Sequence, residues 1–126
     1  MTPEHTPYEA GLGFCVKLNK GDFIGRAALL AQKERGLSRK LCCLLLDDGA
    51  PIVWGREPIL AGETSIGRVT GGNMGHTIGR VIVYGYLPLD QAIVGARYAI
   101  EIAGERWGAE VAAEPLWDAK NARIKA

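Results

Sequence analysis

The side chains able to take part in acid–base chemistry are few and lie far apart in the sequence. His76 ends a glycine-rich stretch at 71–76 and, as an unperturbed imidazole, would titrate near neutral pH. Glu9 follows the pair Thr6-Pro7, and no second titratable group in that motif is available to shift its pKa. We therefore interpret His76 as a loop histidine that bonds nearby backbone, and Glu9 as a partner in a hydrogen bond or salt bridge between lobes. No residue is assigned to catalysis.

The cysteines are Cys15, Cys42 and Cys43, an odd number with two members adjacent in an apolar run. This pattern argues against a disulfide framework and for a reducing compartment, so we expect a cytoplasmic protein. We expect the thiols to be small buried hydrophobic groups. Because no Cys-x-x-Cys or His-x-x-x-His spacing occurs, the sequence predicts no metal site.

The composition is that of an ordinary globular domain. The chain has 126 residues, enough for one domain, with 48% hydrophobic and 23% charged residues. A net charge of +1 gives no global reason to expect nucleic acid or an anionic membrane as a partner. No apolar run approaches the ~18 residues of a membrane-spanning helix, and the polar N-terminus has no signal-peptide core.

The stretch 64–87 is predicted to form two strands joined by a glycine-rich loop. Residues 64–70 alternate with period two, and 77–87 carries a near-continuous apolar run, which is typical of a strand covered on both faces. We predict that the glycines of 71–76 form a loop that lets another chain or a ligand approach closely. This loop is a poor phosphate site, because no Gly-Lys-Ser/Thr follows it and the next element is predicted to be a strand.

The other elements follow from the same patterns. We predict a strand over 11–18, a helix over 25–35 ended by Gly36, and further strands at 41–47, 57–60, 97–102 and 106–112. Since closure removes exposed sheet edges, the natural product is a mainly β protein, a small antiparallel six-stranded Greek-key barrel preceded by one α-helix. The predicted division is an initial part at 1–36, with a strand and the helix, and a β-barrel at 37–126.

Several motifs in this chain occur in the order seen in one known family. They are Thr-Pro-Tyr-Glu-Ala-Gly-Leu at 6–12, Val-Lys-Leu-Asn-Lys at 16–20, Asp-Phe-Ile-Gly-Arg at 22–26, Thr-Gly-Gly at 70–72, Gly-His-Thr-Ile-Gly at 75–79, Tyr-Leu-Pro at 86–88 and Glu-Pro-Leu-Trp-Asp at 114–118. Together they resemble the C-terminal region of the glycine cleavage T-protein (aminomethyltransferase) family. The motif at 16–20 and the tail at 119–123 are most similar to the folate-binding end of sarcosine and dimethylglycine dehydrogenases.

The resemblance implies three lobes around a tetrahydrofolate site, of which this chain supplies the end of the folate-binding lobes and the C-terminal barrel. The family's catalytic aspartate, its pterin-binding glutamate and an arginine lie upstream of the first motif, and the FAD domain of the dehydrogenases has no counterpart here. The chain is therefore expected to bind tetrahydrofolate only with the missing lobes, supplied in cis or as a separate subunit. A homodimer is a further candidate partner.

The resemblance also indicates which residues face the folate. Phe14 lies where the family often carries an aromatic residue that faces the ligand, although buried aromatics usually serve packing. The expected folate-side residues are Phe14, Arg26, Arg68, His76 and Arg123. For the arginines the alternative is an ordinary solvated surface position. Trp117 is expected to dock against a neighbouring lobe.

The predicted function is that of the C-terminal domain of a tetrahydrofolate-dependent aminomethyltransferase-like protein. Such a protein moves a one-carbon unit to folate from an amine such as a glycine-derived aminomethyl group, sarcosine or dimethylglycine. The domain is expected to be inactive without the upstream lobes. Two alternatives remain open: an autonomous non-catalytic barrel that binds a protein or small ligand, and a nonfunctional gene fragment that still folds. A large exposed apolar patch would favour the aminomethyltransferase-like domain, and a homodimer that hides this patch would favour the autonomous barrel.

Overall fold

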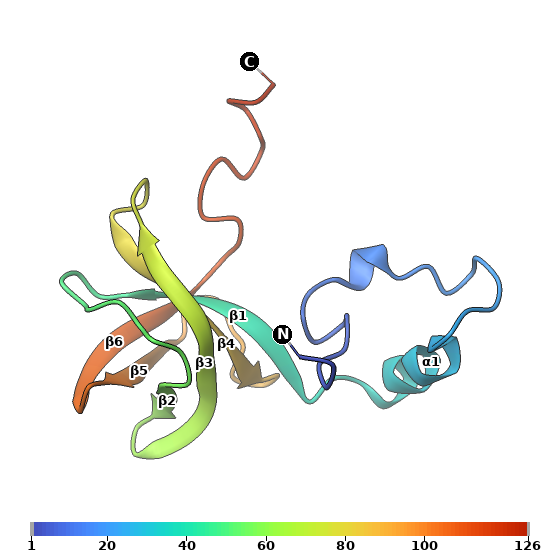
Figure 1. Ribbon diagram of the computed structural model, residues 1–126, viewed down its shortest axis with the longest axis horizontal. Helices are drawn as coiled ribbons and strands as arrows, with labels where there is room; N and C mark the ends of the chain where they lie inside the picture. The colour runs from blue at the N-terminus through green and yellow to red at the C-terminus, as the bar shows by residue number, and fades with distance from the viewer. Residues whose placement is uncertain (1, 126) are drawn as a thin grey trace.

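The computed structural model describes residues 2–125 and consists of a closed antiparallel barrel with an N-terminal segment at its side and a C-terminal tail (Figure 1). The barrel order is β1-β4-β3-β2-β5-β6. The strands are β1 (Arg39–Leu46), β2 (Pro58–Ala61), β3 (Thr64–Gly75), β4 (Arg80–Pro88), β5 (Arg97–Ile102) and β6 (Glu105–Ala112). Before them come a 3₁₀ turn, η1 (Gly13–Cys15), and one helix, α1 (Arg26–Arg35).

The connectivity is a Greek key. β2, β3 and β4 follow one another as hairpin neighbours, whereas β1 lies beside β4 and reaches β2 through the long connection at 47–57. β1 also pairs with β6, and this pairing closes the barrel. The fold predicted from the sequence, a mainly β six-stranded antiparallel barrel with one helix, is confirmed.

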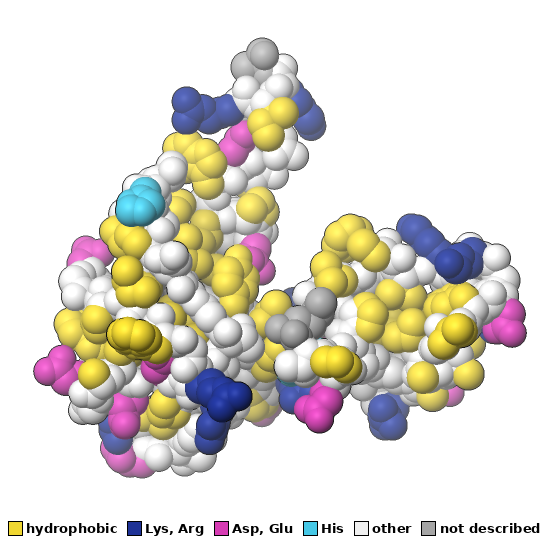
Figure 2. Space-filling view, viewed as in Figure 1, with side chains coloured by type: hydrophobic (Ala, Val, Ile, Leu, Met, Phe, Trp, Pro, Cys, Tyr) yellow, Lys and Arg dark blue, Asp and Glu magenta, His cyan; other side chains and the backbone are white. Residues whose placement is uncertain are grey.

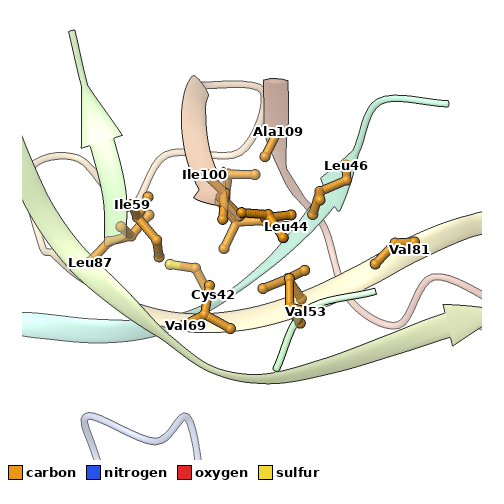
Figure 3. Packing of buried hydrophobic residues seen from close by; sticks show 13 residues of the cluster. Cys42, Leu44, Leu46, Val53, Ile59, Val69, Val81, Leu87, Ile100 and Ala109 are labelled. Carbon is orange, nitrogen blue, oxygen red and sulfur yellow. The ribbon is translucent and has the colours of Figure 1, made fainter. Parts of the chain in front are cut away.

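The core fills the inside of the barrel with aliphatic side chains from all six strands (Figure 3). Successive residues of a strand point to opposite sides, so Leu44 and Leu46 of β1 both enter the core and are fully buried. Ile59 and Ile100, which are paired across β2 and β5, are fully buried as well. Each such side chain contributes on the order of 1.5–3 kcal/mol by leaving water.

The predicted glycine-rich loop at 71–76 is wrong. Residues 71–75 belong to β3 and pair with β4, and the turn lies at 76–79, where the amides of Ile78 and Gly79 donate to the carbonyl of Gly75 at 3.0 and 2.7 Å. Gly72 permits the close approach of two strands. A Cβ at Gly72 would lie 2.5 Å from the carbonyl oxygen of Ile82 and 2.7 Å from Cγ2 of Val53. The chain that approaches this stretch is therefore the protein's own β4.

The strand predicted over 11–18 is also wrong. The chain there forms only η1 and non-regular backbone, and Phe14 and Cys15 are exposed. The alternation of apolar residues is present, but the closed barrel offers no free strand edge for this segment to pair with. The predicted helix is confirmed as α1, and Gly36 ends it with a φ of 84° and an amide that donates to Gln32 at 2.9 Å. At ten residues α1 is too short to span a bilayer, and no helix within 2–125 is long and apolar enough to do so.

We expect Gly72→Ala to lower the free energy of unfolding by about 2 kcal/mol or more, because the new methyl group would overlap backbone and the core side chain of Val53. Gly71→Ala is the matched control, since a Cβ there would meet nothing within 4 Å. That variant should stay within about 0.5 kcal/mol of the parent. Urea denaturation of the two variants measures the difference, and equal stabilities would contradict the close strand approach.

Candidate functional site

The N-terminal segment, residues 2–38, is fastened to the barrel at one junction. Two backbone hydrogen bonds cross it, from the amide of Leu41 to the carbonyl of Glu9 at 2.8 Å and from the amide of Leu89 to the carbonyl of Ser38 at 3.0 Å. The ring of His5 stacks on Tyr86 of β4, with centroids 4.2 Å apart and planes within 6°. The segment otherwise stands beside the barrel, as Figure 1 shows.

Glu9 is the polar centre of this junction. Its carboxylate accepts hydrogen bonds from the amide and hydroxyl of Thr6 at 2.9 and 3.2 Å and from Nε of Arg39 at 3.0 Å. The amide of Thr6, followed by Arg39, lowers the pKa of Glu9 despite the opposing effect of its burial. Nε2 of Gln32 in α1 donates to the same Thr6 hydroxyl at 2.8 Å, so the helix, the first motif and β1 meet here. The interpretation of Glu9 as a salt-bridge partner is confirmed.

The rest of the N-terminal segment has an uncovered apolar side. Gln32 is the buried residue of α1, whereas its Leu29 and Leu30 are only half-buried. Phe14 exposes 73% of its surface and Ile24 is fully exposed. The segment also carries an open, mostly apolar hollow of about 310 Å³. It is lined by Pro7, Leu12, Cys15, Val16, Lys17, Lys20, Phe23 and Leu29. Figure 2 shows hydrophobic side chains exposed on the part of the molecule that stands beside the barrel.

A second hollow, which we call the junction cleft, has a volume of about 600 Å³. One wall is formed by 65–70 of β3 and 86–88 of β4, and the other by His5, Ser38 and Arg39. The guanidinium carbon of Arg39 lies 5.5 Å from the centre of the Tyr86 ring. Arg68 also lines the cleft, and no carboxylate is present among the lining residues. The cleft is therefore basic, with aromatic and apolar walls.

The five expected folate-side residues do not form one site within the described residues. Phe14 and Arg26 lie on the N-terminal segment, and Nε of Arg26 donates to the carbonyl of Leu18 at 2.8 Å. Arg68 lies on β3, while His76 lies in the exposed turn eight residues further on, up to roughly 25 Å away along the strand. Arg123 lies on the C-terminal tail, with its guanidinium 5.6 Å from the ring centre of Trp117.

Sequence reasoning missed His5, Arg39 and Tyr86, which shape the junction cleft together with Arg68. Arg68 and Tyr86 are cross-strand neighbours of β3 and β4, and Leu41 of β1 is paired with Tyr86 on the other side. The register of these strands places the residues together. The first motif, at 6–12, could have pointed to His5, because it follows His5 directly and contains Glu9.

The thiols fall into two groups. Cys42 and Cys43 are buried, as predicted, and burial raises the pKa of the Cys43 thiol to about 11. The prediction of a buried Cys15 is wrong, because the segment around it does not fold as a strand and leaves its side chain exposed. Among residues 2–125, no group of three or more His, Cys, Asp or Glu side chains could hold a metal ion.

The architecture defines a structural class, that of closed six-stranded antiparallel barrels that carry a short helical segment at the N-terminal side. Residues 39–118 match the family of the glycine cleavage T-protein C-terminal barrel domain, and the chain belongs to that family. The resemblance stated from the motifs is thereby confirmed.

Relatives come from both branches of that resemblance. The chain is 41% identical to an aminomethyltransferase of Thermosynechococcus vestitus, over 85% of this chain and 29% of the relative. It is 38% identical to mitochondrial dimethylglycine dehydrogenase of Homo sapiens, over 92% of this chain and 14% of that protein. The crystal structure of the glycine cleavage system aminomethyltransferase T from Bartonella henselae superposes with a TM-score of 0.85 at 28% identity, over 94% of this chain and 34% of that one. The chain thus spans about a third or less of the length of these relatives.

The Glu9 contacts predict a pH-dependent junction. A carboxyl group whose pKa is lowered on folding stabilises the folded state above its unfolded pKa, and this contribution is lost as the pH falls through the folded pKa. The junction should therefore loosen only below the ordinary glutamate value of 4.5. Hydrogen exchange of the Leu41 amide, which is bonded to the Glu9 carbonyl, reports this loosening.

Glu9→Gln should raise the exchange rate of that amide about tenfold at pH 7, because the ion pair with Arg39 is removed. It should also abolish the acid dependence. Glu4→Gln is the control, since Glu4 is exposed on the same segment. Identical exchange in both variants would show that the Glu9 carboxylate does not hold the junction.

Proposed function

We propose that this chain is the C-terminal part of a tetrahydrofolate-dependent aminomethyltransferase-like assembly that moves a one-carbon unit from an amine to folate. The observation that carries the proposal is the uncovered apolar side of the N-terminal segment, in a chain that spans 34% of the solved aminomethyltransferase it superposes on. Upstream lobes, in cis or as a separate subunit, would cover that side.

The energetics favour such a cover. Phe14 and Ile24 present large apolar surfaces on the segment that also carries the apolar hollow, and exposed apolar surface that gathers on one part of a protein marks an interaction surface. Burying a side chain of this size contributes on the order of 2 kcal/mol. The helix α1 also keeps Leu29 and Leu30 half-exposed, although its polar contacts already fix its position. A segment held in place by polar bonds and left open on its apolar side is suited to receive a further lobe.

The fit to folate is partial within this chain. Phe14 offers one exposed aromatic face, but Arg26 is engaged by the carbonyl of Leu18, and His76 lies beyond the far end of β3. A rigid aromatic cradle and an anion close to the developing positive charge are what the transfer requires. Bound tetrahydrofolate would supply the nucleophilic nitrogen that accepts the one-carbon unit. This chain would contribute a wall through Phe14, with the acid–base carboxylate and most of the pterin pocket on the upstream lobes.

A second candidate is an autonomous barrel that binds a protein or small ligand without catalysis. The closed barrel and its complete core favour it, because this part of the chain needs no further cover to be stable. In that case a second copy of the chain would hide the apolar side of the N-terminal segment. The two candidates differ in what covers Phe14.

Calorimetry separates the candidates. Tetrahydrofolate is titrated into the isolated chain, and then into the chain mixed with the upstream two-thirds of an aminomethyltransferase relative. We expect heat of binding in the mixture, and none from either piece alone. Tight binding by the isolated chain would contradict the proposal that most of the pocket lies upstream, and a stable homodimer with no response to the added lobes would favour the autonomous barrel.

Phe14→Ser should weaken association with the added lobes about tenfold, because the apolar contact at the interface is lost. The barrel itself should unfold at an unchanged temperature, since Phe14 lies outside the core. Ile93→Ser is the control: Ile93 is 61% exposed on the connection between β4 and β5 and is not part of the N-terminal segment. Analytical ultracentrifugation of each mixture gives the affinities, and equal weakening by both substitutions would remove the N-terminal segment as the interface.

A further inference from the structure

Arg68 differs from the other arginines of the strands. Arg80 lies 3.8 Å from Asp47 and from Asp48, Arg97 binds Asp47 at 2.8 Å, and Arg106 binds Glu63 at 2.7 Å. Among residues 2–125, no hydrogen bond or ion pair forms to the side chain of Arg68. A guanidinium that is exposed on a strand without a carboxylate retains its full hydrogen-bonding capacity for a ligand.

The surroundings of Arg68 leave its charge uncompensated. The lining residues of the junction cleft include neither aspartate nor glutamate. The nearby carboxylate of Glu9 is engaged by Thr6 and balances the charge of Arg39, with which it forms an ion pair. An anion entering the cleft would therefore meet the unpaired guanidinium of Arg68 in a partly enclosed space, where electrostatic attraction exceeds that at an open surface.

The walls of the cleft indicate the kind of anion. Ile66 and Pro88 provide apolar surface, and the Tyr86 ring is fixed between strands by the stacked ring of His5. A volume of about 600 Å³ suits a small organic molecule, since ligand pockets typically hold a few hundred cubic ångströms. Apolar walls around one free guanidinium suit a flat carboxylate with an apolar body better than an inorganic phosphate, which is strongly hydrated and needs several donors. Guanidinium and carboxylate can pair through two parallel hydrogen bonds.

We propose that the junction cleft binds a small organic carboxylate, with Arg68 as the group that recognises its charge. Ile66 and Pro88 contact the apolar body of the ligand, and His5 and Tyr86 add aromatic surface to the cleft. The inference does not depend on the proposed one-carbon transfer, because the cleft lies wholly between residues of this chain.

The probe is benzoate, titrated into the isotopically labelled chain and followed by ¹H–¹⁵N correlation spectra. Benzamide, which has the same ring without the charge, is the ligand control. We expect saturable shifts at the amides of 65–70 and at the Arg68 Nε with benzoate, and none of that pattern with benzamide. Arg68→Gln should weaken benzoate binding about tenfold, because the paired hydrogen bonds are lost.

The matched protein control is Arg106→Gln, which removes the same charge from a strand arginine that is paired with Glu63 outside the cleft. Its affinity for benzoate should equal that of the parent. Equal weakening by both substitutions, or shifts that do not saturate, would overturn the site. In a last experiment, the benzoate titration is repeated after the upstream two-thirds of an aminomethyltransferase relative has been added. Retained benzoate binding supports a ligand site. Complete loss of binding overturns it, because the added lobes would then occupy the cleft. Neither result decides the tetrahydrofolate titration, so the two proposals can fail separately.

Discussion

The pairing of β1 with two neighbours is the interaction on which the rest of the structure depends. β1 joins β4 on one side and β6 on the other, and so turns a Greek-key sheet into a closed barrel. Its inward residues Leu44 and Leu46 are fully buried, and its first residue, Arg39, holds Glu9 of the N-terminal segment. One strand therefore closes the core, positions the segment beside it and forms part of the junction cleft.

The sequence predicted the barrel well because each strand has its own signal. Period-two alternation marks β5, and glycine-bearing turns mark the hairpins of β2 with β3 and of β5 with β6, without knowledge of the tertiary partners. The glycines at 71–75 and the alternation at 11–18 were misjudged for one shared reason. Whether such residues form a strand depends on a partner: β4 lies beside 71–75, and no strand edge is free for 11–18.

The candidate site was harder to predict for a related reason. His5, Arg39, Arg68 and Tyr86 come from four separate stretches. The register of β1, β3 and β4 brings Arg39, Arg68 and Tyr86 together, and His5 joins them by stacking on Tyr86. The role of Glu9 could be inferred by elimination, because no second titratable group lies in its motif, but its ion-pair partner Arg39 could not be named from the sequence. The motifs gave the family before any geometry was known, whereas the identity of the cleft residues needed the strand pairing.

The two parts of the chain differ in how their side chains are packed. The barrel has a continuous aliphatic core and pairs Arg80, Arg97 and Arg106 with carboxylates, although connections such as those at 47–57 and 89–96 also expose apolar residues. In the N-terminal segment, Glu9 is bound by Thr6 and by Arg39 of β1, but Phe14 and Ile24 are exposed to water. The hydrogen-bonded polar groups fix the position of the segment, whereas its exposed apolar side chains are available for contact with another surface. The combination of a fixed position and exposed apolar side chains in this segment is what supports the proposal that further lobes cover it.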